Sequence, residues 1–192
     1  MLIADPRPSM RGFTLVELMV TVVIVAILAS VALPSFNEFI RRGQIRTASE
    51  AVLNAIQLAR SEAVKRNEAV VFVLGTGTGL TSWEVRDLAG GVIQKSRDSG
   101  EGGGDLETVV RPNGASRITF NGLGRVADNA PGGGVALTSI AFCIPGIVLE
   151  RQVHVVTPGG QVRICDPDIQ GDNDPRRCIS GPDNVPVQRR CP

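Results

Sequence analysis

The chain has 192 residues, a mass of 20.3 kDa and a formal charge of +1, which suits one ordinary domain with some chain to spare. Because basic and acidic residues balance, no global field attracts nucleic acid or anionic lipid, and any such binding must be local. A single histidine, His154, excludes a multi-histidine metal site and a two-histidine mechanism. With 22 glycines, 12 prolines and 4% aromatic residues, the composition favours a loop-rich β domain over a helix bundle.

The first feature along the chain is an uncharged apolar segment from Leu18 to Phe36. Its length is sufficient to cross a bilayer as a helix. Its β-branched residues would make a poor helix in water, but in lipid the backbone must satisfy its hydrogen bonds internally. A removable secretory signal peptide is the alternative, and its apolar core would be shorter, about 7 to 15 residues. The segment therefore predicts a retained transmembrane helix.

Glu17 lies at the start of this apolar segment, where a carboxylate is costly unless it has a partner. The run Arg-Gly-Phe-Thr-Leu-Val-Glu at 11–17, followed by apolar residues, resembles the class III signal of type IV prepilins and type II secretion pseudopilins. The resemblance implies that a prepilin peptidase cleaves between Gly12 and Phe13 on the cytoplasmic side. It also implies N-methylation of Phe13. Residues 1–12 would be the leader and 13–36 the transmembrane and assembly helix.

The same resemblance gives Glu17 and Pro34 their expected roles. In a filament, the Glu17 carboxylate would pair with the terminal amine of a neighbouring subunit's Phe13, which lowers the cost of burying both charges and selects one axial register. Pro34 stands where type IV pilins usually carry a helix-kinking proline. Its missing N–H and its ring predict a bend or local melting near Ser30.

An amphipathic continuation of the helix is expected over residues 37–67. Its apolar positions recur at the helical spacings of three, four and seven residues, and charged residues fill the other faces. Asn67 is the expected helix end. The apolar stripe consists of Ile45, Ala48, Val52, Ala55, Ile56, Ala59 and Ala63.

Residues 68–165 read as a periplasmic β domain, because short apolar or alternating runs are separated by turn residues. The turn residues Thr-Pro-Gly-Gly at 157–160, followed by residues 161–165, suggest a hairpin. The glycine-rich stretches 75–79 and 100–104 are expected to be flexible loops, since no Gly-Lys-Ser/Thr follows them as in a P-loop. The fold class is thus α+β, with the amphipathic stripe packed on antiparallel sheet. The predicted strands are 69–74, 82–88, 92–95, 107–110, 117–120, 135–144, 152–156 and 161–165.

Three segments narrow the resemblance to the GspH/FimT/FimU group of minor pilins and pseudopilins. They are the helical run 51–67, the Phe-Asn-Gly-Leu-Gly-Arg run at 120–125, and Gly-Gln-Val-Arg at 160–163. The resemblance covers residues 11 to about 165 and implies a type IV pilin-like fold. Nothing comparable covers the tail, 166–192.

All four cysteines lie in the part expected outside the cytoplasm, where disulfides form. Three pairings are possible, and we favour Cys143 with Cys165, on two adjacent late strands, and Cys178 with Cys191, closing the tail. Zinc binding by these cysteines is the alternative, and it is disfavoured because the sequence has no CxxC pair and no accessory histidine.

The tail is rich in arginine, and the FimT branch binds DNA through a basic Gly-Arg-x-Arg motif near the final hairpin. Here Gln161 replaces one of those arginines, and five aspartates balance the five arginines from Gly159 onward, so arginines that solvate the tail or contact other subunits are favoured. The arginines are Arg163, Arg176, Arg177, Arg189 and Arg190.

Four of these aspartates raise the question of a Ca²⁺ site, but their spacing matches no EF-hand. A solvated acidic loop is the favoured interpretation, with no metal and no cofactor. The aspartates are Asp166, Asp168, Asp172 and Asp174. His154 and Trp83 are interpreted as sheet residues, because no nucleophile, base and orienting group can be assembled around the lone histidine.

These expectations describe a non-enzymatic minor pilin or pseudopilin in the bacterial inner membrane, single-pass with a periplasmic C-terminal domain. Its expected partners are other minor pilins, the major pilin or pseudopilins, the prepilin peptidase and the assembly platform. The leading role is in type IV pilus biogenesis, in an assembly-initiating or tip complex. A GspH-like role in type II secretion and FimT-like DNA binding during natural transformation are the alternatives.

Overall fold

The computed structural model describes residues 12–75, 79–130, 133–145, 151–156, 159–166, 169 and 174–178, with 31–35 and 151–156 described by their backbone alone. The chain divides into two compact units, here called the N-terminal unit, which ends at Ile40, and the C-terminal unit, which starts at Arg41.

One helix, α1 (Leu15–Arg66), provides the helical part of both units. It is helical without interruption through Pro34, so the local melting predicted near Ser30 does not occur. The bend predicted there stays a prediction.

The C-terminal end of α1 is closed by Asn67, as the sequence predicts. Asn67 adopts a left-handed conformation with φ of 52°. Its N–H donates to the carbonyl of Val64 at 3.3 Å, and the N–H of Glu68 donates to the carbonyl of Ala63 at 3.2 Å. This pair of bonds is a Schellman motif, which satisfies helix carbonyls that would otherwise lack partners.

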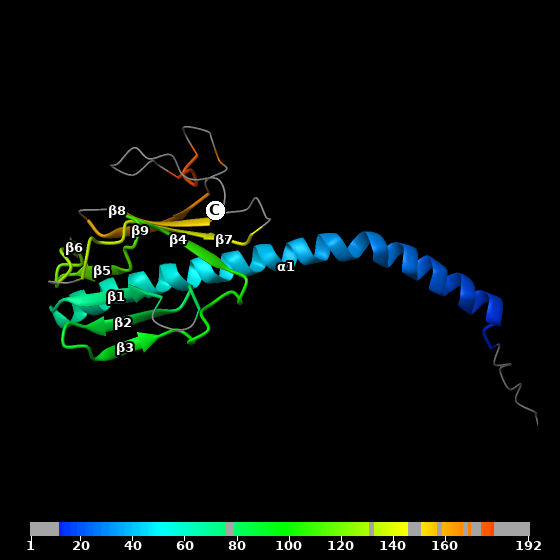
Figure 1. Cartoon of the computed structure of the whole chain (residues 1–192), viewed down its shortest axis with the longest axis horizontal. Helices are drawn as coiled ribbons and strands as arrows, with labels where there is room; N and C mark the ends of the chain where they lie inside the picture. Colours follow the sequence, from blue (N-terminus) through cyan, green and yellow to red (C-terminus); the bar gives the residue numbers. More distant parts are fainter. Residues whose placement is uncertain are drawn as a thin grey trace, which may run out of the picture. The chain divides into compact units, whose positions relative to one another are not determined.

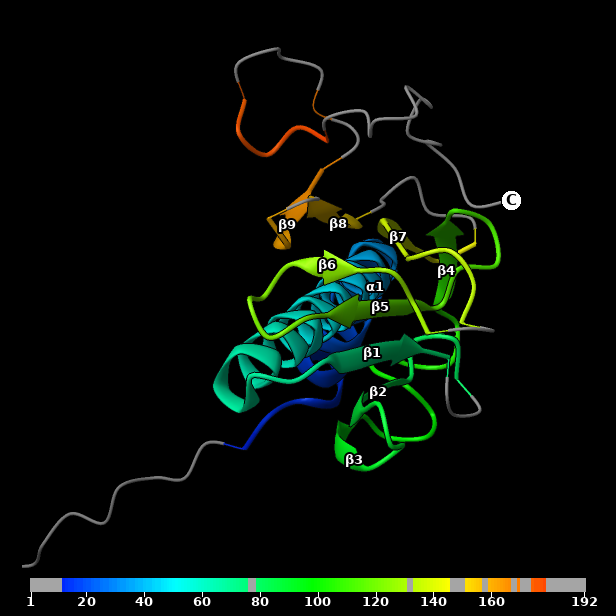
Figure 2. The ribbon, with the colours of Figure 1, turned by 90° about the vertical axis from the view of Figure 1, so that its left-hand side faces the viewer.

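In the described part of the chain, nine strands form two antiparallel sheets that pack on the second half of α1 (Figures 1 and 2). The first sheet has the order β3-β2-β1-β5-β6, and the second has the order β4-β7-β8-β9. In the first sheet the strands are β1 (Val70–Leu74), β2 (Trp83–Asp87), β3 (Val92–Lys95), β5 (Arg117–Phe120) and β6 (Val126–Ala127). In the second they are β4 (Glu107–Arg111), β7 (Ser139–Cys143), β8 (Arg151–Val156) and β9 (Gln161–Cys165).

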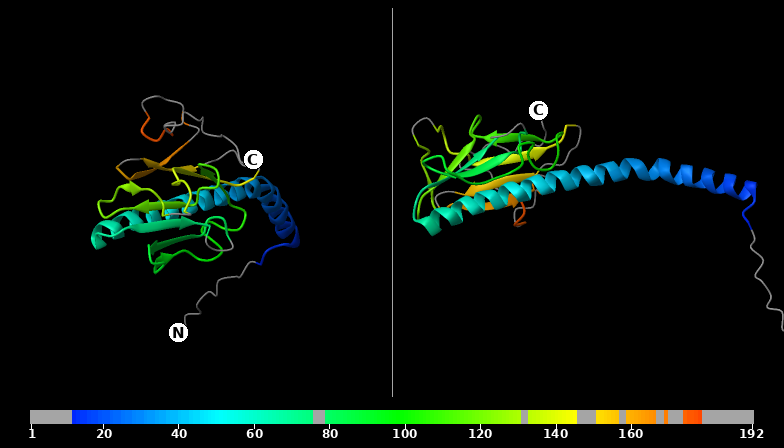
Figure 3. Two further views of the ribbon diagram at one scale, coloured as in Figure 1. Left: turned by 60° about the vertical axis from the view of Figure 1, so that its left-hand side comes forward. Right: turned by 90° about the horizontal axis from the view of Figure 1, so that it is seen from below.

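Both sheets pack on the predicted apolar stripe of α1, which is confirmed at every position. All seven stripe residues, from Ile45 to Ala63, are at most 2% exposed and belong to one core cluster. The cluster includes Phe72 and Phe120 from the first sheet and Phe142 from the second. Figure 3 shows the strands lying along the second half of α1. Because this core lies entirely within the C-terminal unit, that unit has what a domain needs to fold alone.

The strand predictions differ from the structure mainly around β7. The predicted strand 135–144 is shortened to Ser139–Cys143, because the residues before it pass between the sheets. The N–H of Leu137 donates to Arg117 of β5, and the N–H of Thr138 donates to Arg111 of β4. Strand β6 has two residues, too few for an alternating pattern to reveal it.

The glycine-rich stretch 100–104 is a loop, as predicted, and it packs closely on α1. A Cβ at Gly102 would lie 2.6 Å from the carbonyl oxygen of Gln44 and 3.0 Å from the Cβ of Ala48. Its φ of +87° also belongs to the left-handed region. Glycine is therefore required here for close approach to the helix.

Candidate functional site

The predicted processing and assembly motif forms the start of α1. Thr14 precedes the helix, and its Oγ1 accepts a hydrogen bond from the N–H of Glu17 at 3.2 Å. This is an N-cap, and Thr14 with Glu17 has the Thr-x-x-Glu spacing of a capping box. The capping role of Thr14 was not predicted above, although the Thr-x-x-Glu spacing is a sequence signal for it. Cleavage at Gly12 and methylation of Phe13 stay predictions.

The Glu17 side chain is exposed and has no hydrogen bond or ion pair within the described part of the chain. Around it, the apolar side chains of the N-terminal unit are also exposed, from 81% at Phe13 to 43% at Ile40. An apolar surface of this extent marks a site that meets a membrane or other proteins. Among the described residues, no helix combines the length and the apolar character needed to span a bilayer.

At the other end of α1, the three segments that carried the family resemblance meet. Arg60 of the helix donates from its Nε to the carbonyl of Gly124 at 2.9 Å. A Cβ on Gly160 would lie 2.4 Å from that same carbonyl oxygen and 3.3 Å from the ring of Phe120. Arg60 thus fixes the turn after β5, and Gly160 lets the β8–β9 hairpin pack against that turn. The hairpin prediction is confirmed by the antiparallel pairing of β8 and β9.

An open groove of about 640 Å³ separates this part of α1 from β9, the edge strand of the second sheet. Two of the three cations that line it are engaged, because Arg60 binds Gly124 and Lys65 pairs with Glu62 at 3.4 Å. The third is Arg163. Its Nε is buried and makes no hydrogen bond in the described structure.

The predicted cysteine pairing is wrong. Cys165 at the end of β9 is bonded to Cys178 of the tail, which rules out both Cys143–Cys165 and Cys178–Cys191. The reason is strand order, since β8 lies between β7 and β9 and separates them by about 10 Å, beyond the reach of a disulfide. Cys143 is also disulfide-bonded, and Cys191 lies outside the described residues.

The tail arginines are partly committed to contacts within the tail. Arg176 forms two side-chain hydrogen bonds to Asp174, at 3.1 and 2.9 Å. The backbone of Arg177 forms an isolated parallel β-bridge with that of Asp166. The hydrogen bonds from the Arg176 side chain and N–H lower the pKa of Asp174 to about 2. Arg189 and Arg190 lie outside the described residues.

The residues considered above for metal binding are not grouped into a site in the described part of the chain, and those considered for catalysis belong to strands. Asp168 and Asp172 lie outside the described residues, and in the remainder no three acidic, cysteine or histidine side chains are grouped to hold a metal. His154 belongs to β8 and Trp83 to β2, as predicted. Trp83 is in the core, and its buried Nε1 has no hydrogen-bond partner among the described residues.

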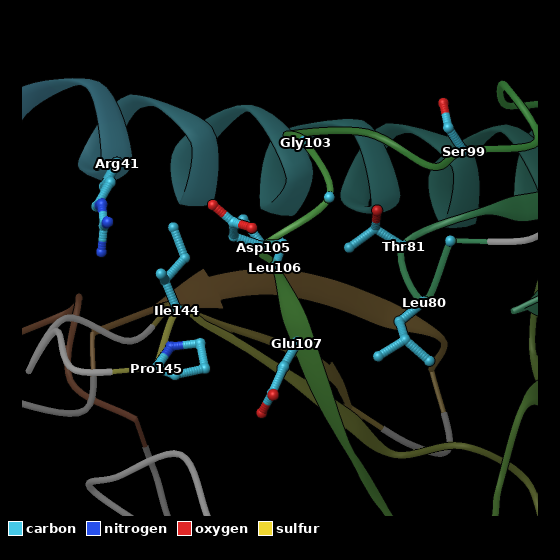
Figure 4. Close-up of a pocket in the computed structure, with 12 residues that line it drawn as sticks. Arg41, Leu80, Thr81, Ser99, Gly103, Asp105, Leu106, Glu107, Ile144 and Pro145 are labelled. Atoms are coloured by element: carbon cyan, nitrogen blue, oxygen red, sulfur yellow. The ribbon is translucent and has the colours of Figure 1, made fainter. Parts of the chain in front are cut away.

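A second pocket, of about 500 Å³, lies where α1 begins within the C-terminal unit (Figure 4). Arg41 of α1 stands at one side and Leu80 at the other, with Leu106 and Ile144 between them. The nearby Thr81 hydroxyl donates to the carbonyl of Glu101 at 2.7 Å, so it is used in holding the loop. The lining also includes the acidic residues Asp105 and Glu107, so this pocket combines one cation, two carboxylates and apolar side chains.

A long N-terminal helix whose second half is packed on antiparallel sheets, with a methylation-type motif at its start, defines a type IV pilin-like protein. The prokaryotic N-terminal methylation motif matches residues 7–33, and the family described as type II transport protein GspH matches residues 48–160. The chain belongs to this GspH family of minor pilins and pseudopilins.

Several known proteins are similar over part of the chain. A fimbrial protein of Moraxella nonliquefaciens is 39% identical over 70 residues, which are 36% of this chain and 44% of that protein. The type IV major pilin protein PilE1 of Neisseria gonorrhoeae is 51% identical over 45 residues, 23% of this chain and 26% of its own length. The chain therefore spans less than half the length of these relatives.

Among solved structures, the type IV minor pilin FimU of Pseudomonas aeruginosa is similar with a TM-score of 0.50 and 21% identity. The similarity covers 66% of this chain and 91% of that one. At this identity it supports the fold alone, which agrees with the α+β class expected from the sequence.

Proposed function

We propose that this protein is a non-enzymatic minor subunit of a type IV pilus, made as a prepilin and held in the inner membrane by one helix, with its C-terminal unit in the periplasm. The observation that carries the proposal is the start of α1, where the methylation motif leads into a helix with exposed apolar side chains. A surface of this kind within a pilin-like chain is suited to storage in lipid and then to packing among the helices of a filament.

Glu17 sets the register of that packing. Its carboxylate has no partner in the described part of its own chain, and the amine that cleavage would create on Phe13 of a neighbour is a suitable one. Pairing offsets the desolvation of both charges. The prepilin peptidase, the assembly platform, the major pilin and other minor pilins are the partners that this cycle requires.

The test is intact-protein mass spectrometry of the chain from cells with and without prepilin peptidase, followed by the recovery of tagged variants in sheared pili. We expect loss of residues 1–12 and one added methyl group. Glu17→Ala should reduce recovery at least tenfold, whereas Glu50→Ala, at an exposed ion pair with Arg46, should leave it unchanged. An uncleaved leader, or normal recovery of Glu17→Ala, would contradict the proposal.

A GspH-like role in type II secretion is the second candidate, favoured by the family match over residues 48–160. A deletion strain distinguishes the two roles. Loss of twitching with normal secretion supports the pilus, and the reverse result supports the secretion system.

DNA binding is the third candidate, and the observation in its favour is the position of Arg163 at the groove, where the other two cations are already engaged. Duplex DNA should then bind the C-terminal unit with an affinity that falls as salt rises. Arg163→Gln should weaken binding, and Arg125→Gln, at an exposed arginine outside the groove, should change it less. Salt-independent or absent binding would remove this candidate.

A further inference from the structure

The outward face of the first sheet carries two arginines beside its central strand. Residues of β1 alternate between the core, which receives Val70 and Phe72, and the outward face, which carries Val71 and Val73. Val71 pairs with Arg86 of β2, and Val73 pairs with Arg117 of β5. The two arginines therefore lie on one face, on opposite sides of β1.

Both arginines line a single pocket of about 270 Å³. Their Cα atoms lie two strands apart across the sheet and two residues apart along it, a separation of about 12 Å. Two arginine side chains are long enough to approach one another across that distance. The floor is formed by Val71 and Thr119. The walls come from the turn after β2, residues 87–90, and from Asn129, Ala130 and Gly133.

The other polar groups of the pocket are already occupied. The Thr119 hydroxyl donates to Oδ1 of Asn129 at 2.8 Å, and Nδ2 of Asn129 donates to the carbonyl of Gly134 at 3.0 Å. The carboxylate of Asp87 accepts a hydrogen bond from the N–H of Gly91 at 2.7 Å. These bonds hold the loop and the turn in place, so the walls of the pocket are fixed by the fold.

The guanidinium groups of Arg86 and Arg117 differ from these neighbours. Neither makes a hydrogen bond or ion pair within the described residues, although Asp87 lines the same pocket and Glu84 lies on the same face. Each guanidinium presents a rigid fork of N–H donors that matches the oxygens of a phosphate or carboxylate. With two guanidinium groups and the single carboxylate of Asp87, the pocket keeps a net positive charge that favours an anion. The small volume admits one such group and little more.

We propose that Arg86 and Arg117 form a binding site for a phosphate group on the outward face of the first sheet. Each guanidinium donates to the phosphate oxygens, while Val71 and Thr119 form the floor. The group can be free phosphate or the terminal phosphate ester of a larger molecule. This site lies on a different sheet from the groove beside β9 and does not involve Arg163.

The test is a titration of the C-terminal unit from Arg41 onward with inorganic phosphate, glycerol 3-phosphate and acetate, followed by the amide NMR signals of Val71, Gly90 and Thr119. We expect saturable shifts with both phosphates, and at least tenfold weaker binding of acetate. Preference for glycerol 3-phosphate assigns an ester, and preference for inorganic phosphate assigns the free ion.

Arg86→Gln and Arg117→Gln should each weaken phosphate binding at least tenfold, whereas Arg125→Gln, at an exposed arginine outside the pocket, should leave it unchanged. Arg86→Lys and Arg117→Lys keep the charge and remove the fork of donors, so they should bind phosphate with intermediate affinity. They provide the test if the glutamine variants do not fold. Absence of saturable shifts, equal binding of acetate, or binding unaffected by all four substitutions would overturn the proposal.

Discussion

The two halves of α1 are made from the same secondary structure and treat their apolar side chains in opposite ways. In the N-terminal unit the large apolar side chains that the structure describes are exposed, whereas in the C-terminal unit seven apolar side chains of α1 form a stripe that is at most 2% exposed. Among the described residues, only the C-terminal half of α1 therefore buries apolar side chains against other parts of the same chain. In the function proposed above, the other half obtains this burial from lipid or from other subunits.

The largest effect on this comparison should come from the buried stripe. Ile56→Ala removes a side chain that is completely buried, and should destabilise the C-terminal unit by about 2–5 kcal/mol. Ile24→Ala, at an exposed position of the N-terminal unit, should leave the same transition unchanged. Thermal unfolding of the full chain in mild detergent, followed by the fluorescence of Trp83, measures both. Equal losses from the two variants would show that the halves are not energetically separate.

The disulfide of the C-terminal unit should have the next largest effect. Cys165→Ser opens a bridge across a sequence separation of 13 residues, which corresponds to about 3 kcal/mol in the chain-entropy model. Denaturant unfolding of the C-terminal unit measures the loss, with the reduced wild type as control. Non-reducing digestion should yield a peptide that joins Cys165 to Cys178. A peptide joining Cys143 to Cys165 would contradict the structure.

A smaller loss is expected where the hairpin meets the turn after β5. Gly160→Ala places a Cβ against the carbonyl of Gly124 at a φ of +67°, and should cost about 1–3 kcal/mol. Gly134→Ala has a similar φ of +71° but open space around the new Cβ. This variant should lose only the free energy that a left-handed backbone conformation costs alanine, about 1 kcal/mol. Equal melting temperatures for the two variants would show that the close approach is unimportant.

The smallest effect concerns the tail. The Asp174 carboxyl, with its pKa lowered to about 2 by Arg176, should favour the folded tail above pH 4, and this contribution should disappear as the pH falls toward 2. Side-chain carboxyl NMR of the C-terminal unit measures the titration. Arg176→Gln should return the pKa of Asp174 toward its ordinary value. Titration of the wild type at that ordinary value would contradict the ion pair.

Much of the fold could be predicted because local signals agree with it. The bounds of β3, β5 and β9 match the predicted ranges to the residue, since turn residues flank each alternating run. The stripe on α1 and its end at Asn67 follow from helical periodicity and from the tolerance of asparagine for a left-handed conformation.

The predictions that were wrong, and the features that were not predicted, concern structure that local sequence patterns do not encode. The cysteine pairing assumed that β7 and β9 were neighbours, and a strand order of β4-β7-β8-β9 cannot be read from local pattern. The two-residue β6 is too short to leave an alternating pattern. The crossing at Leu137 and Thr138 depends on Arg117 and Arg111, which lie on other strands. The bond from Arg60 to Gly124 joins residues 64 positions apart and leaves no periodic trace.

The sequence by itself determined the helix, its amphipathic second half, the methylation motif and the strand segments, because these depend on side-chain chemistry and spacing along a few turns or strands. Only the tertiary structure decided which cysteines bond, which residues meet at the end of α1, and that Arg86 and Arg117 share a pocket. Such contacts depend on the order of strands within a sheet, and that order is set by packing around the common core.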